Sequence, residues 1–439
     1  MNEMRYIITK YKDGVLSFAL DTKDSKMESV VFTHSNENIN DAKIGDIFVA
    51  KVKNVAKQIN AAFIDYAPNQ KGYLPINTEY VPIITNRQYD GRILAGDEIL
   101  VQLEKEAVRT KEPVFTVNLS LAGKYSVVSY ANTYKGVSRK CTKLEREQLR
   151  TAIPQEINYG VVIRTNAVSL LHTSDADDTK SKLSFHLCNT SRTEVMANIS
   201  PLTMSSAKTE SIEALQPIKD EIKYLNDKMS SLIHDGIHRT CYSRIWKAAP
   251  SYLTTMRDEG IMYQQIITDD AQIYGEVKDF AALYMPEQIA NISLYQDDSY
   301  PLHKLYRVET QLDELLAKKV WLKSGAYLVI EKTEAMYVID VNSGKNIAKK
   351  ANTEYIYQIN MEAANEIMRQ IRLRNLTGMI LVDFINMDDV EKENALLQEL
   401  RVLAKKDHIL TTIVDITALG LVEITRKKTT KSLAEQLYH

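Results

Sequence analysis

Two aspartates, Asp340 and Asp383, combine a residue type and a placement that suit catalysis in this 439-residue sequence. Each lies near the carboxyl end of an apolar stretch that predicts a β-strand, and a helical stretch separates them. Open α/β sheets bind ligands beyond the carboxyl ends of their strands, so these carboxylates could share one Mg²⁺ ion. Such an ion activates water and stabilises a phosphate during cleavage. The pattern therefore permits phosphodiesterase chemistry, although capping of the turn Asp340–Gly344 is the commoner role of such an acid.

The elements that must position these acids alternate between strand and helix, which is the order of an α/β unit. Apolar residues three or four apart predict a long helix that begins near Asn352 or Thr353, both capping types. Its buried face is expected to comprise Ile356, Ile359, Ala363, Ile367 and Ile371. The neighbouring elements are expected as strands at residues 326–330, 336–340, 379–384 and 409–416 and as a helix at residues 390–404.

The first half of the chain has shorter periodic segments. Residues 6–20 predict a hairpin that turns at Lys12-Asp13-Gly14. Short alternating stretches between residues 45 and 103 predict a small barrel, and an OB-fold is the first choice. Residues 209–233 have the spacing of an amphipathic helix that Pro217 interrupts.

The composition is that of a folded chain with more than one domain. Hydrophobic residues make up 44% and charged residues 26% of the sequence, which excludes a disordered or fibrous chain. The formal net charge of −2 neither indicates nor excludes a nucleic-acid partner. Three cysteines and eight histidines have no spacing of a disulfide framework or a metal site. With neither a membrane-spanning apolar run nor a signal peptide in the sequence, we expect a cytoplasmic protein without a membrane partner.

Four sequence blocks near the two aspartates resemble the signature of the ribonuclease E/G family. They follow one another in the order and spacing of that family, which makes the resemblance specific. The first block is Ser324–Ala335, which Ile339–Gly344 continues. The other blocks are Asn360–Ala364, Arg369–Arg374 and Leu381–Ile385.

The resemblance implies an endoribonuclease that cuts single-stranded RNA with Mg²⁺. It implies that Asp340 and Asp383 bind the metal and that the amide of Asn342 orients an acid. The compact, ribonuclease G-type branch of the family is the nearer comparison. A role in RNA processing or decay follows, with 5′-monophosphorylated RNA as a preferred substrate.

A looser resemblance covers the predicted barrel. Residues 45–76 resemble the OB domain of the family, in which aromatic side chains stack on RNA bases. Phe63 and Tyr73 match those positions, and Lys111 matches a basic RNA contact. From the residues alone, filling of the barrel core is an equally common role of such aromatic residues.

Further basic residues resemble or permit phosphate contacts. Arg139, Arg164 and Thr165 resemble the region of the family that recognises a 5′-monophosphate, where an arginine forks onto phosphate oxygens. A surface arginine is the ordinary alternative. Arg369 and Arg372 share one helix face and are assigned to RNA binding. Positions Arg426-Lys427-Lys428 could also contact phosphates, whereas Arg374 and Lys431 are expected on a solvated face.

The family architecture implies a mixed α/β and α+β fold. An OB-fold barrel and a sensor region are inserted into a split RNase H-like subdomain, and a deoxyribonuclease I-like catalytic subdomain follows. The expected divisions are 1–35 (RNase H-like, first part), 36–120 (OB-fold), 121–219 (5′-sensor), 220–290 (RNase H-like, second part), 291–431 (catalytic) and 432–439 (tail).

Two positions depart from the family pattern. Asn386 stands where the family usually has Asp. The zinc-binding Cys-Pro-x-Cys would follow Ser432-Leu433 but is absent before His439, which argues against a zinc-linked dimer while leaving a homodimer open. Two alternatives to the nuclease stay open, a non-catalytic RNA-binding protein that keeps the channel and a DNA-directed phosphodiesterase.

Overall fold

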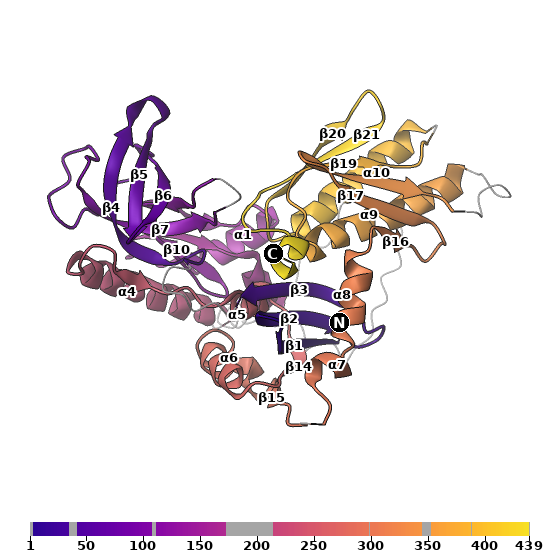
Figure 1. Ribbon diagram of the computed structural model, residues 1–439, viewed down its shortest axis with the longest axis horizontal. Helices are drawn as coiled ribbons and strands as arrows, with labels where there is room; N and C mark the ends of the chain where they lie inside the picture. The colour runs from indigo at the N-terminus through magenta and orange to yellow at the C-terminus, as the bar shows by residue number, and fades with distance from the viewer. Residues whose placement is uncertain are drawn as a thin grey trace, which may run out of the picture. The chain divides into compact units, whose positions relative to one another are not determined.

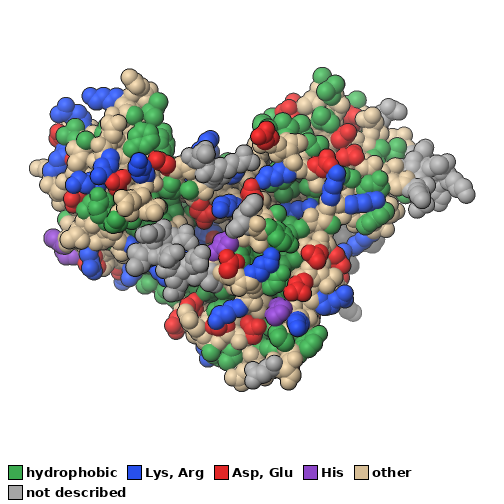
Figure 2. All heavy atoms as spheres, in the orientation of Figure 1, with side chains coloured by type: hydrophobic (Ala, Val, Ile, Leu, Met, Phe, Trp, Pro, Cys, Tyr) green, Lys and Arg blue, Asp and Glu red, His purple; other side chains and the backbone are tan. Residues whose placement is uncertain are grey.

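The computed structural model describes residues 3–34, 42–107, 111–172, 214–297, 299–344, 353–387 and 389–438 (Figure 1). These residues fold as two compact units. The first comprises Met1–Asp41, Lys105–Lys111 and Ala249–His439, and the second comprises Ala42–Glu104 and Glu112–Ala248. Basic and acidic side chains are interspersed over the visible face (Figure 2).

The first unit contains a five-stranded sheet in the order β15-β14-β1-β2-β3. Strands β1 and β2 form the predicted hairpin, in which Lys12 takes the left-handed backbone conformation of a tight turn. Strands β14 and β15 run parallel to β1, and the helices α5 and α6 bury apolar side chains against this sheet. The bounds are β1 (Met4–Tyr11), β2 (Gly14–Asp21), β3 (Met27–His34), α5 (Ser251–Asp258), β14 (Tyr263–Thr268), α6 (Ala271–Tyr284) and β15 (Ile292–Leu294).

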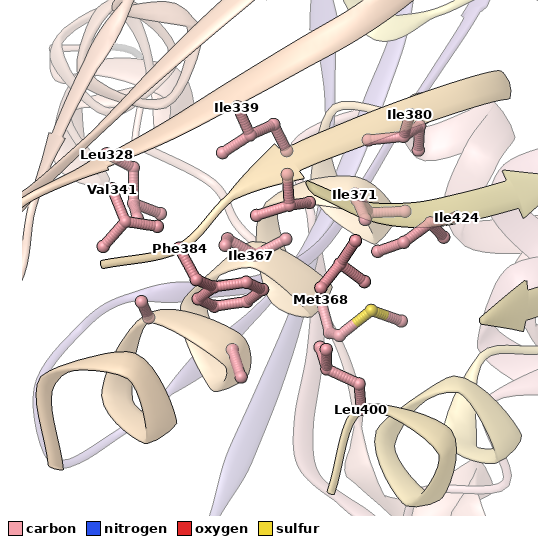
Figure 3. Close-up of a cluster of buried hydrophobic side chains, with 14 of the residues drawn as sticks. Leu328, Ile339, Val341, Ile367, Met368, Ile371, Ile380, Phe384, Leu400 and Ile424 are labelled. Carbon is pink, nitrogen blue, oxygen red and sulfur yellow. The ribbon is translucent and has the colours of Figure 1, made fainter. Parts of the chain in front are cut away.

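A second sheet in this unit has six strands in the order β16-β17-β18-β19-β21-β20. The helices α9 and α10 cover one of its faces (Figure 1). Figure 3 shows Ile339 and Ile380 from the strands pointing toward Ile367 and Met368 of α9. The bounds are β16 (Lys319–Trp321), β17 (Tyr327–Lys332), β18 (Met336–Asn342), α9 (Thr353–Leu373), β19 (Gly378–Asp383), α10 (Val390–Lys406), β20 (Thr411–Ile416) and β21 (Leu421–Arg426).

These elements confirm the predicted α/β order. The long helix α9 covers the expected span and buries Ile359, Ala363, Ile367 and Ile371, whereas Ile356 is only partly buried. Strand β21 was not predicted, and it pairs antiparallel with both β19 and β20. Short helices complete the unit as η4 (Pro286–Asn291), α7 (Leu302–Leu305), α8 (Val308–Leu316) and α11 (Leu433–Leu437).

The second unit contains the predicted barrel. Five strands follow the order β4-β5-β6-β8-β7, and the additional pairing of β4 with β7 closes the sheet on itself. Side chains such as Ile64, Leu74 and Phe115 are buried inside, so a closed OB-like barrel is confirmed. The bounds are β4 (Ile47–Ala56), η1 (Lys57–Ile59), β5 (Ala61–Ala67), β6 (Gln70–Pro75), β7 (Glu98–Lys105), β8 (Val114–Thr116) and β13 (Arg244–Trp246), which extends β4.

A four-stranded sheet, β11-β12-β10-β9, lies beside the long helix α4 in the same unit. Pro217 lies in the first turn of α4, where its missing N–H costs nothing, so it begins the helix and does not interrupt it. The expected start at residues 209–213 lies outside the described residues. The bounds are β9 (Ser120–Ala122), β10 (Ser126–Ser129), β11 (Lys135–Val137), α1 (Lys143–Arg150), β12 (Gly160–Ile163), η2 (Thr165–Val168), α2 (Ser169–His172) and α4 (Gln216–Ile237).

Two basic residues occupy positions that contradict the sequence-based expectation. Arg374 is 6% exposed and donates hydrogen bonds to Gln370 and to the carbonyl of Ala317, so its assignment to a solvated face is wrong. Burial lowers its pKa to about 10. Arg426 is 3% exposed and forms a buried ion pair, which excludes the expected RNA contact for its guanidinium. Among the described helices, none is both long and apolar enough to cross a membrane.

Candidate active site

Asp340 and Asp383 lie side by side at the carboxyl ends of two parallel strands. The register of β18 and β19 pairs these two residues directly. Neighbouring strands are ~4.8 Å apart, and paired residues of a parallel ladder point to the same face. Both carboxylates therefore lie within reach of one ion, although the sequence separates them by an entire helix.

The two acids project from the face of the sheet opposite α9 and α10, which we call the outer face. On β18, Ile339 and Val341 are buried while Asp340 is half-buried. On β19, Val382 is buried while Asp383 is exposed. The alternation follows from the two-residue period of a strand, and it leaves the carboxylates open to a ligand.

Asn342 holds the carboxylate of Asp340 in place. The two residues lie on the same face of β18, two positions apart, and the Asn342 Nδ2 atom donates a 2.5 Å hydrogen bond to Asp340 Oδ2. This bond fixes one oxygen of Asp340 and restricts the rotation of its carboxylate. The arrangement matches the acid-orienting amide that the family resemblance implies for this position.

Two residues of α9, for which the sequence pattern predicts no role, brace the segments around the acids. The buried Asn360 pins the segment after Asp383, because its amide donates to the Ile385 carbonyl (2.7 Å) and accepts from the Ile385 N–H (3.2 Å). Glu362 accepts the N–H of Lys323 (2.7 Å) in the turn between β16 and β17. Both belong to the block Asn360–Ala364, and for Asn360 the available signal is a polar residue on the buried face of a predicted helix.

Gly344 closes the same end of the sheet. Its φ of +68° lies in the left-handed region, and a Cβ atom there would come within 2.5 Å of the Gly325 carbonyl oxygen. Glycine is therefore required at position 344, where the chain leaves β18 and passes close to Gly325 in the turn that precedes β17.

The donor set suits a hard divalent cation. Two carboxylates from neighbouring strands supply oxygen ligands, and Mg²⁺ is commonly bound by one or two carboxylates while it keeps several waters. Within the described part of the chain, no group of three or more His, Cys, Asp or Glu residues could hold a metal. The pair Asp340 and Asp383 thus fits an ion that is shared between protein, water and a phosphate substrate.

An aromatic pair lies on the outside of the barrel in the second unit. Phe63 and Tyr73 are partners in the register of β5 and β6, and their ring centroids are 5.9 Å apart. Phe63 is 37% exposed while its neighbours Ala62 and Ile64 are buried, so the alternative of a core-filling role is wrong for this ring. Lys111 is exposed and lies two residues before Pro113, whose carbonyl accepts the N–H of Tyr73 (2.9 Å).

The residues assigned to phosphate sensing follow two neighbouring strands of the small sheet. Strands β11 and β12 are parallel, and Val137 pairs with Ile163. Arg139 follows the first strand while Arg164 and Thr165 follow the second, so all three leave the sheet at its carboxyl edge. The Arg164 guanidinium donates a 2.7 Å hydrogen bond to the Gly123 carbonyl, which anchors it. Arg139 and Thr165 are exposed.

Comparison with known proteins identifies the family. The profile of the Ribonuclease E/G family matches residues 189–429, which is more than half of the chain. This chain belongs to the ribonuclease E/G family. The matched region contains Asp340, Asn342 and Asp383, and the prediction made from the four sequence blocks is confirmed.

Curated members of the ribonuclease E/G family align with nearly the whole chain. The chain is 29% identical over 408 residues to Ribonuclease G of Haemophilus influenzae, covering 90% of this chain and 74% of the relative. It is 28% identical over 407 residues to Ribonuclease G of Escherichia coli strain K12, with the same coverages. Ribonuclease E of the same strain is 29% identical over 410 residues, and the alignment covers 34% of that protein.

Of the two arginines of α9 that are assigned to RNA binding in this ribonuclease E/G family member, Arg369 has contacts within the protein. Arg369 forms ion pairs with Glu28 (3.2 Å) and Glu366 (3.0 Å) and also donates to the Met27 carbonyl. Burial lowers the pKa of Arg372, which is surrounded by Asp407 and other charged groups. The Arg369 guanidinium is thus engaged within the protein, and the RNA-binding role of the two arginines stays a prediction.

Proposed function

We propose that this chain is a Mg²⁺-dependent endoribonuclease that cleaves single-stranded RNA in RNA processing or decay, in the cytoplasm. The observation that carries the proposal is the direct pairing of Asp340 with Asp383 at the carboxyl ends of parallel strands. Mg²⁺, when bound, would supply an activated water and offset the charge that develops on the scissile phosphate. Family membership and the named relatives Ribonuclease G and Ribonuclease E support RNA as the substrate.

The residues of this chain would act by binding and orientation. Asp340 and Asp383 would hold the cation, and Asn342 would keep the Asp340 oxygen aimed at it through the hydrogen bond described above. Asn360 and Glu362 would keep the surrounding loops in place. Such positioning is the main contribution of a protein to a metal-assisted phosphoryl reaction.

Phe63 and Tyr73 are proposed as a stacking platform for bases of the RNA, with Lys111 as a phosphate contact. The exposed ring of Phe63 supports this role, because a base can stack on an aromatic side chain whatever its sequence. Arg139, Arg164 and Thr165 are proposed to bind a 5′-monophosphate. Their shared edge of the small sheet supports that assignment, since arginine and hydroxyl groups are suitable donors to phosphate oxygens.

Phe63→Ala is expected to weaken binding of a single-stranded oligoribonucleotide about tenfold, because stacking contributes ~1–3 kcal/mol per base. Fluorescence anisotropy in EDTA measures this Kd without cleavage. Leu94→Ala removes an exposed apolar side chain of comparable size from the same unit and should change Kd less than twofold. Equal losses in both variants would show that the Phe63 ring has no special part in binding.

The finer architecture is also a proposal. We assign the sheet β15-β14-β1-β2-β3 to a split RNase H-like subdomain, the sheet with Asp340 to a deoxyribonuclease I-like subdomain, and the region around β11 and β12 to the sensor. The contribution of segments far apart in sequence to the first sheet supports the split, since β1 pairs with β14.

The function is tested with a 5′-monophosphorylated, A/U-rich single-stranded RNA, its 5′-hydroxyl counterpart and a DNA of the same sequence. With Mg²⁺ we expect internal cleavage of RNA, faster for the 5′-monophosphate form, and no cleavage in EDTA. DNA should stay intact. Binding of RNA without cleavage would instead support a non-catalytic RNA-binding protein, and cleavage of DNA would support a DNA-directed phosphodiesterase.

A further inference from the structure

The outer face of the catalytic sheet carries an aromatic pair that the proposed function does not yet use. Trp321 of β16 and Tyr327 of β17 are partners in the strand register, and their ring centroids are 5.2 Å apart. Trp321 is 64% exposed. A tryptophan that leaves most of its surface in water has a large apolar face available to a ligand.

The strand register places this pair beside the proposed catalytic residues. Tyr327 pairs with Asn342 across β17 and β18, and Asn342 contacts Asp340 through its side chain. Tyr327 therefore lies one strand, ~4.8 Å, from Asn342, and Trp321 lies one strand farther on the same face. The two rings thus lie on the same face as the acids, two and three strand spacings (~10 and ~14 Å) from β19, so they would meet a base a short way along the strand from the cleaved phosphate.

Lys319 adds a positive charge at the same place. Its Nζ atom lies 3.9 Å from the ring centroid of Trp321 and 3.5 Å from that of Tyr327. An exposed cation–π contact is worth ~0.5–1 kcal/mol, whereas stacking of a nucleobase on an aromatic ring is worth ~1–3 kcal/mol. A base can therefore displace the ammonium group from the rings, and the displaced group stays close enough to neutralise a phosphate of the same strand.

We propose that Trp321, Tyr327 and Lys319 form a subsite that stacks one base of the RNA a short way along the strand from the cleaved bond and neutralises a neighbouring phosphate. This inference rests on the proposed function, because it assigns the base to the substrate of that site. The competing explanation is purely structural. A cross-strand aromatic pair on an edge of a sheet stabilises the sheet by ~0.2–1 kcal/mol without any ligand.

The first experiment uses the fluorescence of Trp321 and does not require cleavage. The chain has two tryptophans, Trp246 and Trp321, so Trp246→Phe leaves Trp321 as the sole tryptophan. Titration of this variant with a single-stranded oligoribonucleotide in EDTA is expected to quench its emission saturably. An abasic oligonucleotide of equal length, which has the same phosphates but no bases, should quench at least fivefold less. Equal quenching by both, or none by either, would overturn the proposal.

The second experiment is kinetic. Trp321→Ala is expected to raise KM for RNA about tenfold with kcat changed less than threefold, and Trp321→Phe should restore most of the loss. Met379→Ala is the matched control, because Met379 is an exposed apolar residue of the same face at the opposite end of β19. Its KM should stay within twofold of the wild type. A similar rise in KM for both variants would support the structural explanation. So would faster amide hydrogen exchange in β16 and β17 of Trp321→Ala that accompanies its rise in KM.

The two experiments separate this inference from the proposed function. Quenching by RNA without any cleavage by the wild type would retain the stacking subsite and reject the nuclease. Cleavage that depends on Mg²⁺, together with an emission of Trp321 that RNA does not change, would retain the nuclease and reject the subsite.

Discussion

Replacing Asp383 by Asn is expected to lower kcat for RNA cleavage at least about a thousandfold. The amide has the shape of the carboxylate but removes one negative charge and one anionic ligand from the pair with Asp340. A metal that is bound at the reacting phosphate contributes several kcal/mol, and ~4 kcal/mol corresponds to about three orders of magnitude in rate. Single-turnover cleavage of a labelled RNA at saturating Mg²⁺ measures the effect.

A matched control for this variant is available on the same sheet. Asp415 is an exposed acid near the end of β20, where its carboxylate accepts the N–H of Ile416. Asp415→Asn should cleave within about threefold of the wild type. The Asp383→Asn variant should also bind Mn²⁺ more weakly in an electron paramagnetic resonance titration while it retains its affinity for RNA in EDTA. Normal cleavage by Asp383→Asn, or weak RNA binding, would show that the acid does not act through a metal.

The positions of the two acids could be predicted from the sequence, but their pairing could not be derived from periodicity. Apolar stretches ending in Asp340 and Asp383 indicated strands, and the intervening helix indicated a crossover between parallel neighbours. Neither pattern fixes the register, because a shift by one residue would turn one acid toward the core. The register is set by the packing of the strands against α9, and a local sequence pattern does not contain this tertiary packing.

Arg374 and Arg426 show what local patterns do not reveal. The pattern of charges at the end of the predicted helix places Arg374 on a solvated face, but the end of α9 packs against another sheet of the same unit, and Leu373 is buried there. The sequence does contain a signal for the burial of Arg426. Val422, Ile424 and Arg426 alternate along β21, so the period of two places the arginine on the core face with the two apolar residues.

The buried ion pair between Asp407 and Arg426 is expected to have the largest single effect on stability. The Arg426 Nε atom lies 2.7 Å from Asp407 Oδ2, and both side chains are almost fully buried. Arg426 also donates to Asn375 Oδ1 (2.6 Å) and to the Leu376 carbonyl. The pair thus connects the end of α10, strand β21 and the turn that precedes β19. Strand β19 is the one that ends in Asp383.

Asp407→Asn is expected to lower the unfolding free energy of this sheet by about 3–5 kcal/mol. Removal of one partner leaves a buried guanidinium without a counter-charge, and the cost of that burial exceeds the value of the lost contact itself. The chain has two compact units, so one unfolding transition does not describe it. Amide hydrogen exchange in β19 and β21 reports the opening of the sheet directly. Glu354→Gln, which breaks a partly exposed pair with Lys392, should cost less than about 1 kcal/mol.

The pH dependence gives a second test of the same ion pair. Burial opposes ionisation of Asp407, but hydrogen bonds from Arg426, its positive charge and the Thr411 hydroxyl outweigh that effect, and the pKa of Asp407 is lowered. A lowered pKa contributes stability that is fully present above the unfolded value of ~3.9 and is lost as the pH falls through the folded value. The difference between wild type and Asp407→Asn should therefore be constant near neutral pH and shrink below about pH 4. A protonated Asp407 has no charge and should stabilise the sheet no more than asparagine does. If the difference in unfolding free energy instead stays the same in acid, the destabilisation comes from the shape of the amide and not from the lost charge.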